Sequence, residues 1–343
     1  MIPVLAELAY WQQSALKVVG VLAAVLVPAG AFVQLFLFKM VSHLQSRLGP
    51  MEAGPHGSLQ ALAEITKFIQ KEDIVPARAD RFVFKMAPFI VFVTVPLIYF
   101  AVPWGPDALF SNIDAGVFYV LAVSSVSVIG VLIAGWASAN KYSLMGAIRA
   151  AGQLIAYELP MVLAVVGVVI QAGTMNLQGI VVMQAEGEIF GFDAIGNPFF
   201  LTQLVGFVVF LIAMQAELTQ TPFDMPVAES ELVTGYMTEY SGLRFLLFFL
   251  AEFAAVGAFG AVASTLWLGG WYLPGLDIDA NYMNLVGPAI LFGKILFIAF
   301  LVFWVRFTYP RFREDQLQAF AWKWLIPISL VNIVETGVFK VVF

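Results

Sequence analysis

Five acidic residues crowd one short stretch of the chain, between two strongly apolar segments. Residues 217 to 240, ELTQTPFDMPVAESELVTGYMTEY, hold no lysine and no arginine. The acids are Glu217, Asp224, Glu229, Glu231 and Glu239. Carboxylates at the edge of a bilayer are rare and tend to mark ion, proton or substrate paths. The stretch therefore favours proton-coupling chemistry, and a solvated acidic loop is the alternative interpretation.

Two further acids lie within apolar runs, Glu158 in GQLIAYELP and Glu252 in LRFLLFFLAEFAAVGAF. An unpaired charge inside a membrane costs roughly 2.5 kcal/mol or more, so each should be protonated, hydrated or paired with a base. A proton relay and a structural ion pair are both open roles. Arg149, Gln153 and Tyr157 precede Glu158 at intervals of four residues, which places them on one helical face.

The composition is that of an integral membrane protein. Hydrophobic residues make up 61% of the 343 residues and charged residues 12%, against about 25% charged in soluble domains. Mean hydropathy is +0.90. With no cysteine, the chain forms no disulfide and holds no thiolate metal site or iron–sulfur cluster of its own. Its net charge of −6 offers no basic footprint for nucleic acid, and His43 and His56 do not form a metal-binding pattern.

Eight apolar runs are about long enough to cross hydrocarbon as helices. They cover residues 15 to 38, 83 to 104, 117 to 136, 155 to 172, 200 to 216, 243 to 269, 286 to 305 and 322 to 341. A β-barrel would show apolar and polar residues in alternation, whereas these runs are continuous. The sequence predicts an all-α, polytopic membrane protein that forms a single integral membrane domain over residues 1 to 343.

Basic residues set the expected orientation. They gather in the loops after the first, third and seventh spans, while residues 105 to 116, 173 to 199 and 270 to 285 contain none. By the positive-inside rule both termini face outward. The segments expected on the cytoplasmic side are 39 to 82, 137 to 154, 217 to 242 and 306 to 321. In the first of them, apolar residues from Leu59 to Ile69 recur at helical spacing and predict an amphipathic helix lying in the interface. A surface helix packed on its own protein and a helix that roofs a lipid-side entrance are both open roles.

Four strings in these segments resemble the signature loops of the H subunit of respiratory complex I, the proton-pumping NADH:quinone oxidoreductase. They are QSRLGP with LQALAEITK, then NKYSLMGAIRAAGQLIAYE, TPFDMPVAESELVTGYMTEYSG and VRFTYPRFREDQLQAFAWKWLIP. The match runs from the first span to the last, and the strings are long and in order. The resemblance implies a membrane-arm subunit that forms part of a quinone tunnel and couples quinone reduction to proton transfer.

The resemblance also implies the setting of the chain. Quinone would be the substrate, and the iron–sulfur clusters and FMN would lie in partner subunits. The expected partners are the other membrane-arm and peripheral-arm subunits, quinone and membrane lipid, without nucleic acid. The expected location is the inner (plasma) membrane of a prokaryotic cell rather than an organellar inner membrane.

Site residues follow from the resemblance position by position. The proton-coupling set is Glu158, Glu217, Asp224, Glu229, Glu231, Glu239 and Glu252. The set expected at the quinone tunnel or a subunit interface is Arg47, Glu64, Lys67, Phe68, Arg149, Gln153, Tyr157, Phe223, Tyr240, Arg306, Arg311, Arg313 and Asp315. For Phe68 and Phe223, ordinary packing is the competing and favoured role, because phenylalanine is so frequent in the chain. The position of Asp224 before Pro226 predicts that it caps a helix start, with a role in a water chain left open.

The chain departs from the family pattern at a few charged positions. Leu37 and Phe38 stand where the family has Glu-Arg, Val227 where it has Glu, and Glu64 where it has Asp. Losing carboxylates from a coupled network shifts the pKa values of its other members, so quinone access is better supported than full pumping stoichiometry. Lys294, isolated in the seventh span, is expected to reach the interface or to pair with a buried acid.

Two other functions compete with this interpretation. A transporter that works alone would also use eight spans and buried acids, but the chain has no clear internal repeat and its polar loops are long and one-sided. The membrane anchor of a related hydrogenase-type complex would share the acidic loops and differ in its partner. The amphipathic-helix loop favours quinone over this relative.

Overall fold

The computed structural model describes residues 12, 15–23, 32–187, 196–276 and 282–342, and within these residues the chain is helical and contains no strand. Among these described residues, six helices are long and apolar enough to cross a membrane. They are α5 (Arg81–Ala101), α6 (Gly116–Ala137), α7 (Lys141–Ala172), α12 (Gly242–Trp267), α13 (Met283–Thr308) and the continuous helix Glu314–Val341, whose parts are α14 (Glu314–Phe320), a π-helical turn (Ala321–Leu325) and α15 (Ile326–Val342). The prediction of an all-α, polytopic membrane protein is confirmed.

Shorter helices complete the bundle. They are a π-helical segment (Val33–Met40), α3 (Val41–Leu44), α4 (Gln60–Gln70), α8 (Leu177–Glu186), α9 (Phe199–Thr202), α10 (Leu204–Glu217) and α11 (Glu229–Leu232), with short 3₁₀ turns at Pro55–Gly57 and Gly235–Met237. The predicted amphipathic helix is α4, and none of its residues is buried in the chain.

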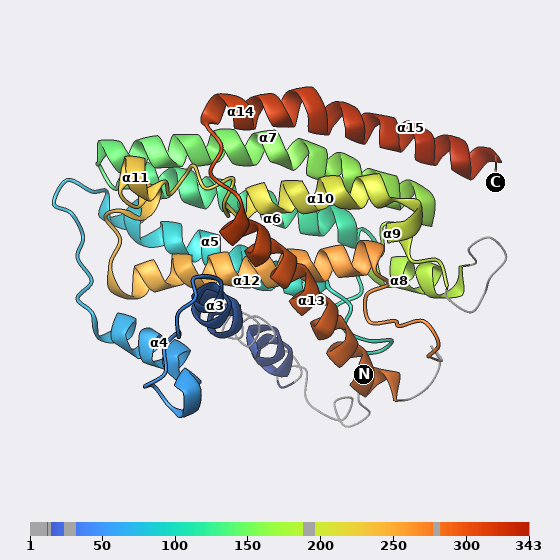
Figure 1. Ribbon diagram of the computed structural model, residues 1–343, viewed down its shortest axis with the longest axis horizontal. Coiled ribbons are helices and arrows are strands. Elements are labelled where there is room, and N and C mark those ends of the chain that lie inside the picture. The colour runs from blue at the N-terminus through green and yellow to red at the C-terminus, as the bar shows by residue number, and fades with distance from the viewer. Residues whose placement is uncertain (1–11, 13–14, 24–31, 188–195, 277–281, 343) are drawn as a thin grey trace.

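The long helices pack in sequence order and then close on one another. Helix α5 packs on α6, α6 on α7, and α7 on both α10 and α15, while α12 packs on α5 and α13. In Figure 1 most of these helices run side by side, and α13 crosses them obliquely. Helices α3 and α4 lie beneath α12 in that view, on the side of the bundle away from α15.

Two of the eight predicted spans differ from simple long helices. The fifth, expected over 200 to 216, is broken at Gln203, where α9 ends and α10 begins after a non-helical residue. The buried Gln203 side chain donates to Thr336 Oγ1 and accepts from Asn332 Nδ2, which joins this break to the last helix. The first span lies partly outside the described residues, and its described part continues to Leu44 as π-helix and α3.

The segment 137 to 154, expected as a cytoplasmic loop, is mostly helical. Helix α7 begins at Lys141, far ahead of the predicted start at residue 155, and is 32 residues long, or about 48 Å. Asn140 caps it, because its side chain accepts a hydrogen bond from the Tyr142 amide at 2.9 Å. The family strings of this segment therefore lie on a rigid helix.

Candidate functional site

Helix α7 presents one polar face to the acidic segment, defined here as residues 217 to 242. Arg149, Gln153 and Tyr157 follow one another along that face, as their spacing predicts. Gln153 is fully buried, and its Nε2 donates to the carbonyl oxygens of Ala216 and Phe223 at 2.7 Å each. This single side chain therefore joins the end of α10 to the turn that follows it.

Tyr157 ties the same face to the C-terminal helix. Its hydroxyl donates to the carbonyl oxygen of Leu317 in α14 at 2.9 Å. Its ring meets Phe223 edge-on, with 5.1 Å between centroids, and Phe223 also packs against Phe312. Phe223 is buried, so in this chain it packs between α7 and the connection that leads into α14.

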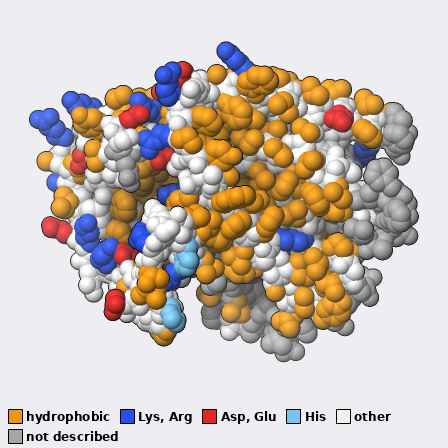
Figure 2. Space-filling view, viewed as in Figure 1, with side chains coloured by type: hydrophobic (Ala, Val, Ile, Leu, Met, Phe, Trp, Pro, Cys, Tyr) orange, Lys and Arg blue, Asp and Glu red, His pale blue; other side chains and the backbone are white. Residues whose placement is uncertain are grey.

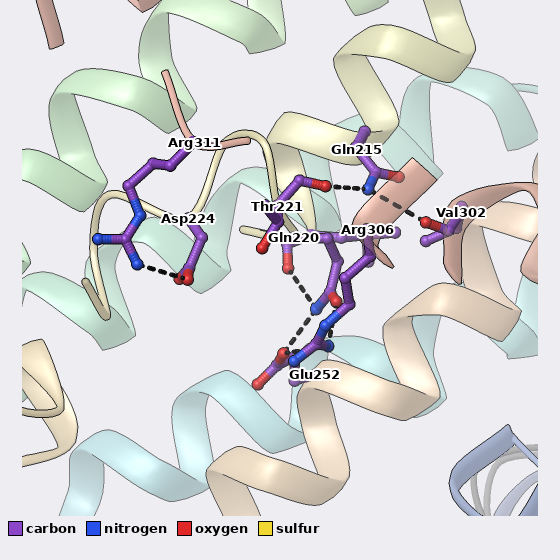
Figure 3. A network of polar contacts seen from close by, with 9 residues as sticks. Gln215, Gln220, Thr221, Asp224, Glu252, Val302, Arg306 and Arg311 are labelled. Carbon is purple, nitrogen blue, oxygen red and sulfur yellow. Dashed lines mark hydrogen bonds and ion pairs between the residues drawn. The ribbon is translucent and has the colours of Figure 1, made fainter. Parts of the chain in front are cut away.

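Glu252 is held by groups from two other elements. Gln220, in the acidic segment, donates from Nε2 to Glu252 Oε1 at 2.5 Å, and Arg306 of α13 donates to Gln220 Oε1. The Arg306 guanidinium lies 3.8 Å from the Glu252 carboxylate. Figure 3 shows these three side chains converging from the acidic segment, α12 and α13. Glu252 has no basic residue near it in the sequence, and Arg306 of α13 supplies one in the fold.

Glu217 ends α10 at the wall of a cavity. The cavity has a volume of about 80 Å³, which is room for a few water molecules, and lies among α5, α6, α7 and α12. Its polar lining comprises Glu217, Glu252, Thr94, Ser124, Ser127, Thr219 and Tyr236. Among the described residues, the buried Glu217 Oε2 has no hydrogen-bond partner, and Glu158 is close enough to interact with it electrostatically. The cavity therefore brings the acids Glu217 and Glu252 to one small chamber.

A second set of carboxylates lies on the outer side of the acidic segment. Glu231 accepts a hydrogen bond from Arg149 at 2.6 Å, and Arg149 Nε also lies 3.8 Å from Glu314. The Arg149 guanidinium lowers the pKa of Glu231 from its ordinary value of 4.5. Glu231 is therefore an anion at neutral pH, held at the end of the molecule where α7, α11 and α14 meet.

The prediction that Asp224 caps a helix start is wrong. Helix α11 begins after Ala228 and has no side-chain cap, whereas the Asp224 carboxylate accepts a hydrogen bond from Arg311 at 3.1 Å. The connection between α13 and α14 brings Arg311 there, because the Phe312 amide donates to the Pro222 carbonyl at 3.0 Å. Figure 3 shows this pair beside the Glu252 network. The Glu229 side chain is outside the described part of the structure.

Glu239 and Tyr240 fix the end of the acidic segment. Glu239 accepts a hydrogen bond from Asn140 Nδ2 at 2.5 Å. The Tyr240 ring stacks on Phe84 of α5 with 4.1 Å between centroids, and its hydroxyl donates to the Phe84 carbonyl oxygen at 3.2 Å. Both residues thus join the acidic segment to the starts of α5 and α7.

The predicted residues of the first loop lie apart from these carboxylates. Lys67 forms an ion pair with Glu64 on α4 itself, and Arg47 donates to Gln45 at 2.7 Å. Phe68 stacks on Phe245 of α12 at 5.6 Å, so α4 lies against the start of that helix. On the C-terminal side, Arg313 pairs with Asp315 at 2.8 Å in an exposed ion pair that does not reach the cavity.

The three apolar residues that stand where the family has charged ones are packed as apolar residues. Leu37 and Phe38 are partly buried and contact the main core, and Val227 contacts the smaller core around Tyr236 and Phe248. Each replacement of a charged residue by an apolar one therefore lies where the surroundings are apolar.

Sequence reasoning missed several residues that hold the site. Gln220 bridges Glu252 and Arg306, and Arg244 of α12 forms an ion pair with Asp73 at 2.9 Å. Ser241 adds a second link to that loop, because its hydroxyl accepts from the Ile74 amide at 3.1 Å. A lone arginine at the start of an apolar run, as in SGLRFLLFF, was the available signal for Arg244.

Comparison with known proteins agrees with this arrangement. The family model described as NADH dehydrogenase matches residues 16–337. The NADH-quinone oxidoreductase H subunit of Dehalococcoides mccartyi (strain CBDB1) is 44% identical over 300 residues, covering 87% of this chain and 79% of that protein. The corresponding H subunit of Brevibacillus brevis is 43% identical over 300 residues, covering 88% of this chain and 85% of that protein.

A third relative matches over a longer stretch. The NADH-quinone oxidoreductase H 2 subunit of Syntrophobacter fumaroxidans is 42% identical over 327 residues, covering 92% of this chain and 93% of that protein. The family match spans nearly the whole chain, and the relatives are covered over most of their length. The chain therefore belongs to the NADH dehydrogenase family.

Proposed function

We propose that this chain is the membrane-arm subunit of a proton-translocating NADH:quinone oxidoreductase and that its buried carboxylates couple quinone reduction to proton transfer. The observation that carries the proposal is the pair of acids, Glu217 and Glu252, on one cavity inside a helical membrane bundle. Family membership supports the reaction, since the relatives are named as subunits of that enzyme. The electrons would come from iron–sulfur clusters and FMN in partner subunits.

The chemistry demands proton donors near the quinone. Reduction to the quinol takes up two electrons and two protons, and negative charge develops before the protons arrive. Groups in a poorly solvated site respond strongly to such charge, because it is weakly screened there. Glu252 is bound through Gln220 to Arg306, so a proton gained or lost at Glu252 alters the charge balance of a network that includes the acidic segment.

A proton path would run from the acidic segment inward. Glu231 and Asp224, each paired with an arginine, lie on its outer side, and Glu217 and Glu252 lie on the cavity. Glu158, half-buried on α7, interacts electrostatically with Glu217. Water in the cavity, hydrogen-bonded to Thr94, Ser124 and Tyr236, would carry protons between the acids.

The first cytoplasmic segment, residues 39 to 82, would form the entrance through which quinone reaches the site. Helix α4 exposes Leu62 and Ile69, and Phe68 anchors it on α12. An amphipathic helix with apolar residues left uncovered by its own chain is suited to the membrane interface, where a lipid-soluble quinone arrives. We assign Arg47, Glu64 and Lys67 to this entrance and to contacts with partner subunits.

The test compares Glu217→Gln with Glu186→Gln in membranes containing the whole complex. Glu186 is an exposed carboxylate on α8, away from the acidic segment, so it is a matched control. In Glu217→Gln, NADH-driven quinone reduction coupled to proton uptake should fall by about tenfold or more. Reduction of hexacyanoferrate, which tests the peripheral arm alone, should remain. Unchanged quinone turnover and proton uptake in Glu217→Gln would remove the cavity acids from the mechanism.

The proteins that co-purify with this chain provide a second test. Purification in mild detergent should yield subunits that contain iron–sulfur clusters and flavin. A nickel-containing subunit would instead identify a hydrogenase-type complex, and isolation of the chain alone would indicate a transporter.

A further inference from the structure

One stripe of α15 has the spacing of a helix–helix contact but faces away from the rest of the chain. Trp324, in the π-helical turn that leads into α15, and Ile328, Val331 and Val338 of α15 are 62%, 39%, 66% and 56% exposed. Together with Glu335 they recur at alternating intervals of four and three residues. This is the spacing with which one helix meets another at a shallow crossing angle. Figure 2 shows hydrophobic side chains over much of the surface formed by α13 and α15. We call these five residues the α15 stripe.

Another face of α15 already supplies the contacts that hold the helix in the bundle. Ser329, Asn332 and Thr336 are buried there. Asn332 donates to Gln203 at 2.9 Å, and Gln203 donates to Thr336, which joins α15 to the break between α9 and α10. The fold of this chain therefore does not use the α15 stripe.

Glu335 makes this surface unlike one that simply faces lipid. It is exposed, and among the described residues no basic group forms an ion pair with it. The nearby Lys340 turns elsewhere and donates to the carbonyl oxygens of Ile170 and Gln171 at 2.6 and 3.1 Å. A carboxylate on the outside of an apolar helix is unfavourable in hydrocarbon unless a partner compensates its charge.

Glu335 lies within the span predicted over residues 322 to 341. It follows Trp324 by eleven residues, which is about 16 Å along the helix. Lysine and arginine side chains can reach toward the interface from within a span, whereas the glutamate side chain is shorter. A counter-charge brought by a partner would allow Glu335 to remain ionised within the membrane.

We propose that the α15 stripe is the docking surface for a transmembrane helix of another subunit, which carries a lysine or arginine opposite Glu335. The inference rests on the proposed function only in that the chain works within a multisubunit membrane complex. Apolar knobs from the partner helix pack between Trp324, Ile328, Val331 and Val338, and the ion pair sets the register of the two helices. The partner is thus a basic, membrane-spanning helix and not a soluble protein or a lipid.

Photo-crosslinking in the whole complex tests the surface. A photoreactive phenylalanine analogue is placed at Val331 and, as a matched control, at Leu330. Leu330 is 50% exposed and lies about a third of a turn away around the same helix. Val331 should give a cross-link to one other membrane subunit, identified by mass spectrometry as a peptide from a transmembrane helix that contains lysine or arginine. Cross-links at Val331 only to lipid, or to the same products as Leu330, would overturn the proposal.

Charge exchange tests the ion pair. Glu335→Lys should lower the amount of assembled complex on native gels by about tenfold or more, whereas Glu335→Gln should lower it much less. Replacing the partner's basic residue by glutamate in the Glu335→Lys background should restore assembly. Normal assembly of Glu335→Lys, or failure of the exchange to restore it, would refute the ion pair. Loss of coupling in Glu217→Gln is independent of this outcome, because that variant is expected to assemble.

Discussion

At the scale of single residues, the Glu252 network allows the effect of charge to be separated from the effect of packing. Arg306→Met removes the only cation that the described structure places beside Glu252, at 3.8 Å. Removing one partner of a fully buried ion pair costs roughly 3–5 kcal/mol, and this pair is partly accessible, so a smaller loss is expected. Thermal unfolding of the purified complex should show a lower Tm for Arg306→Met and a partial recovery in the double variant with Glu252→Gln.

The matched control for this prediction is Arg313→Met. Arg313 is 77% exposed and pairs with Asp315 on the surface, where an ion pair contributes about 0–1 kcal/mol. Its Tm should remain close to that of the unmodified complex. An equal fall in Tm for Arg306→Met and Arg313→Met would show that the ion pair between Glu252 and Arg306 does not stabilise the complex.

The Arg149 and Glu231 pair should make stability depend on pH in the acid range. Arginine lowers the pKa of Glu231 below its ordinary value of 4.5. A carboxylate whose pKa is lower in the folded state contributes stability above its ordinary pKa, and this contribution is lost as the pH falls through the folded-state value. The Tm of Glu231→Gln should therefore lie slightly below that of the unmodified complex at pH 7, by the equivalent of less than about 1 kcal/mol, because Glu231 is 54% exposed. The two Tm values should converge below pH 4.5, and a difference that grows on acidification would contradict this account.

At the scale of elements, Lys294 holds the turn after α12. Its ammonium contacts backbone oxygens rather than a buried acid, donating to the carbonyls of Leu268, Gly270 and Tyr272 at 2.6, 2.8 and 2.5 Å. These groups follow the helix end, where carbonyls lack partners within the helix. Lys294→Met should destabilise the complex by about 1–3 kcal/mol, measured as a fall in Tm. Lys85→Met, at an exposed position of α5, should have little effect, and an equal loss in both variants would argue against the role of Lys294 in the turn.

Apolar runs predicted most of the long helices, because the helix satisfies the backbone polar groups itself and only apolar side chains enter hydrocarbon at low cost. Helix α7 shows the limit of that reasoning. A run-based prediction takes Lys141, Arg149 and Gln153 as loop residues, yet the helix includes them, since Asn140 caps its start and Gln153 finds two backbone carbonyls. Such partners come from elements distant in sequence, and the spacing within one helix does not reveal them.

The same limit applies to the candidate site. The spacing of Arg149, Gln153 and Tyr157 gave their shared face correctly. It did not give the pairing of Glu252 with Arg306, or of Asp224 with Arg311, because each pair depends on how α13 crosses α12 and leads into α14. Gln220 is a neutral residue that a search for charges passes over, although it contacts both Glu252 and Arg306.

At the scale of the whole molecule, charge is distributed unevenly along the helix axes. Figure 2 shows charged side chains gathered at the end of the molecule that carries α4 and α11, and mostly hydrophobic ones over α13 and α15. The loops predicted to be cytoplasmic supply this end, including Arg311, Arg313 and Glu314. The apolar surface suits a chain whose long helices each cross a membrane. The charged end suits contact with water-soluble partners on one side of that membrane.

Single cysteines can test this orientation against a clean background, because the chain has no cysteine of its own. Asp315→Cys replaces a 65% exposed side chain at the charged end, and Tyr282→Cys a 48% exposed one at the start of α13, near the opposite end. A membrane-impermeant maleimide should label Asp315→Cys only from the cytoplasmic side, and more strongly after peripheral subunits are stripped with chaotrope. Tyr282→Cys should react only from outside, with or without stripping. Labelling of Asp315→Cys from the outside would reverse the orientation, and labelling that stripping does not increase would show that no partner covers this position.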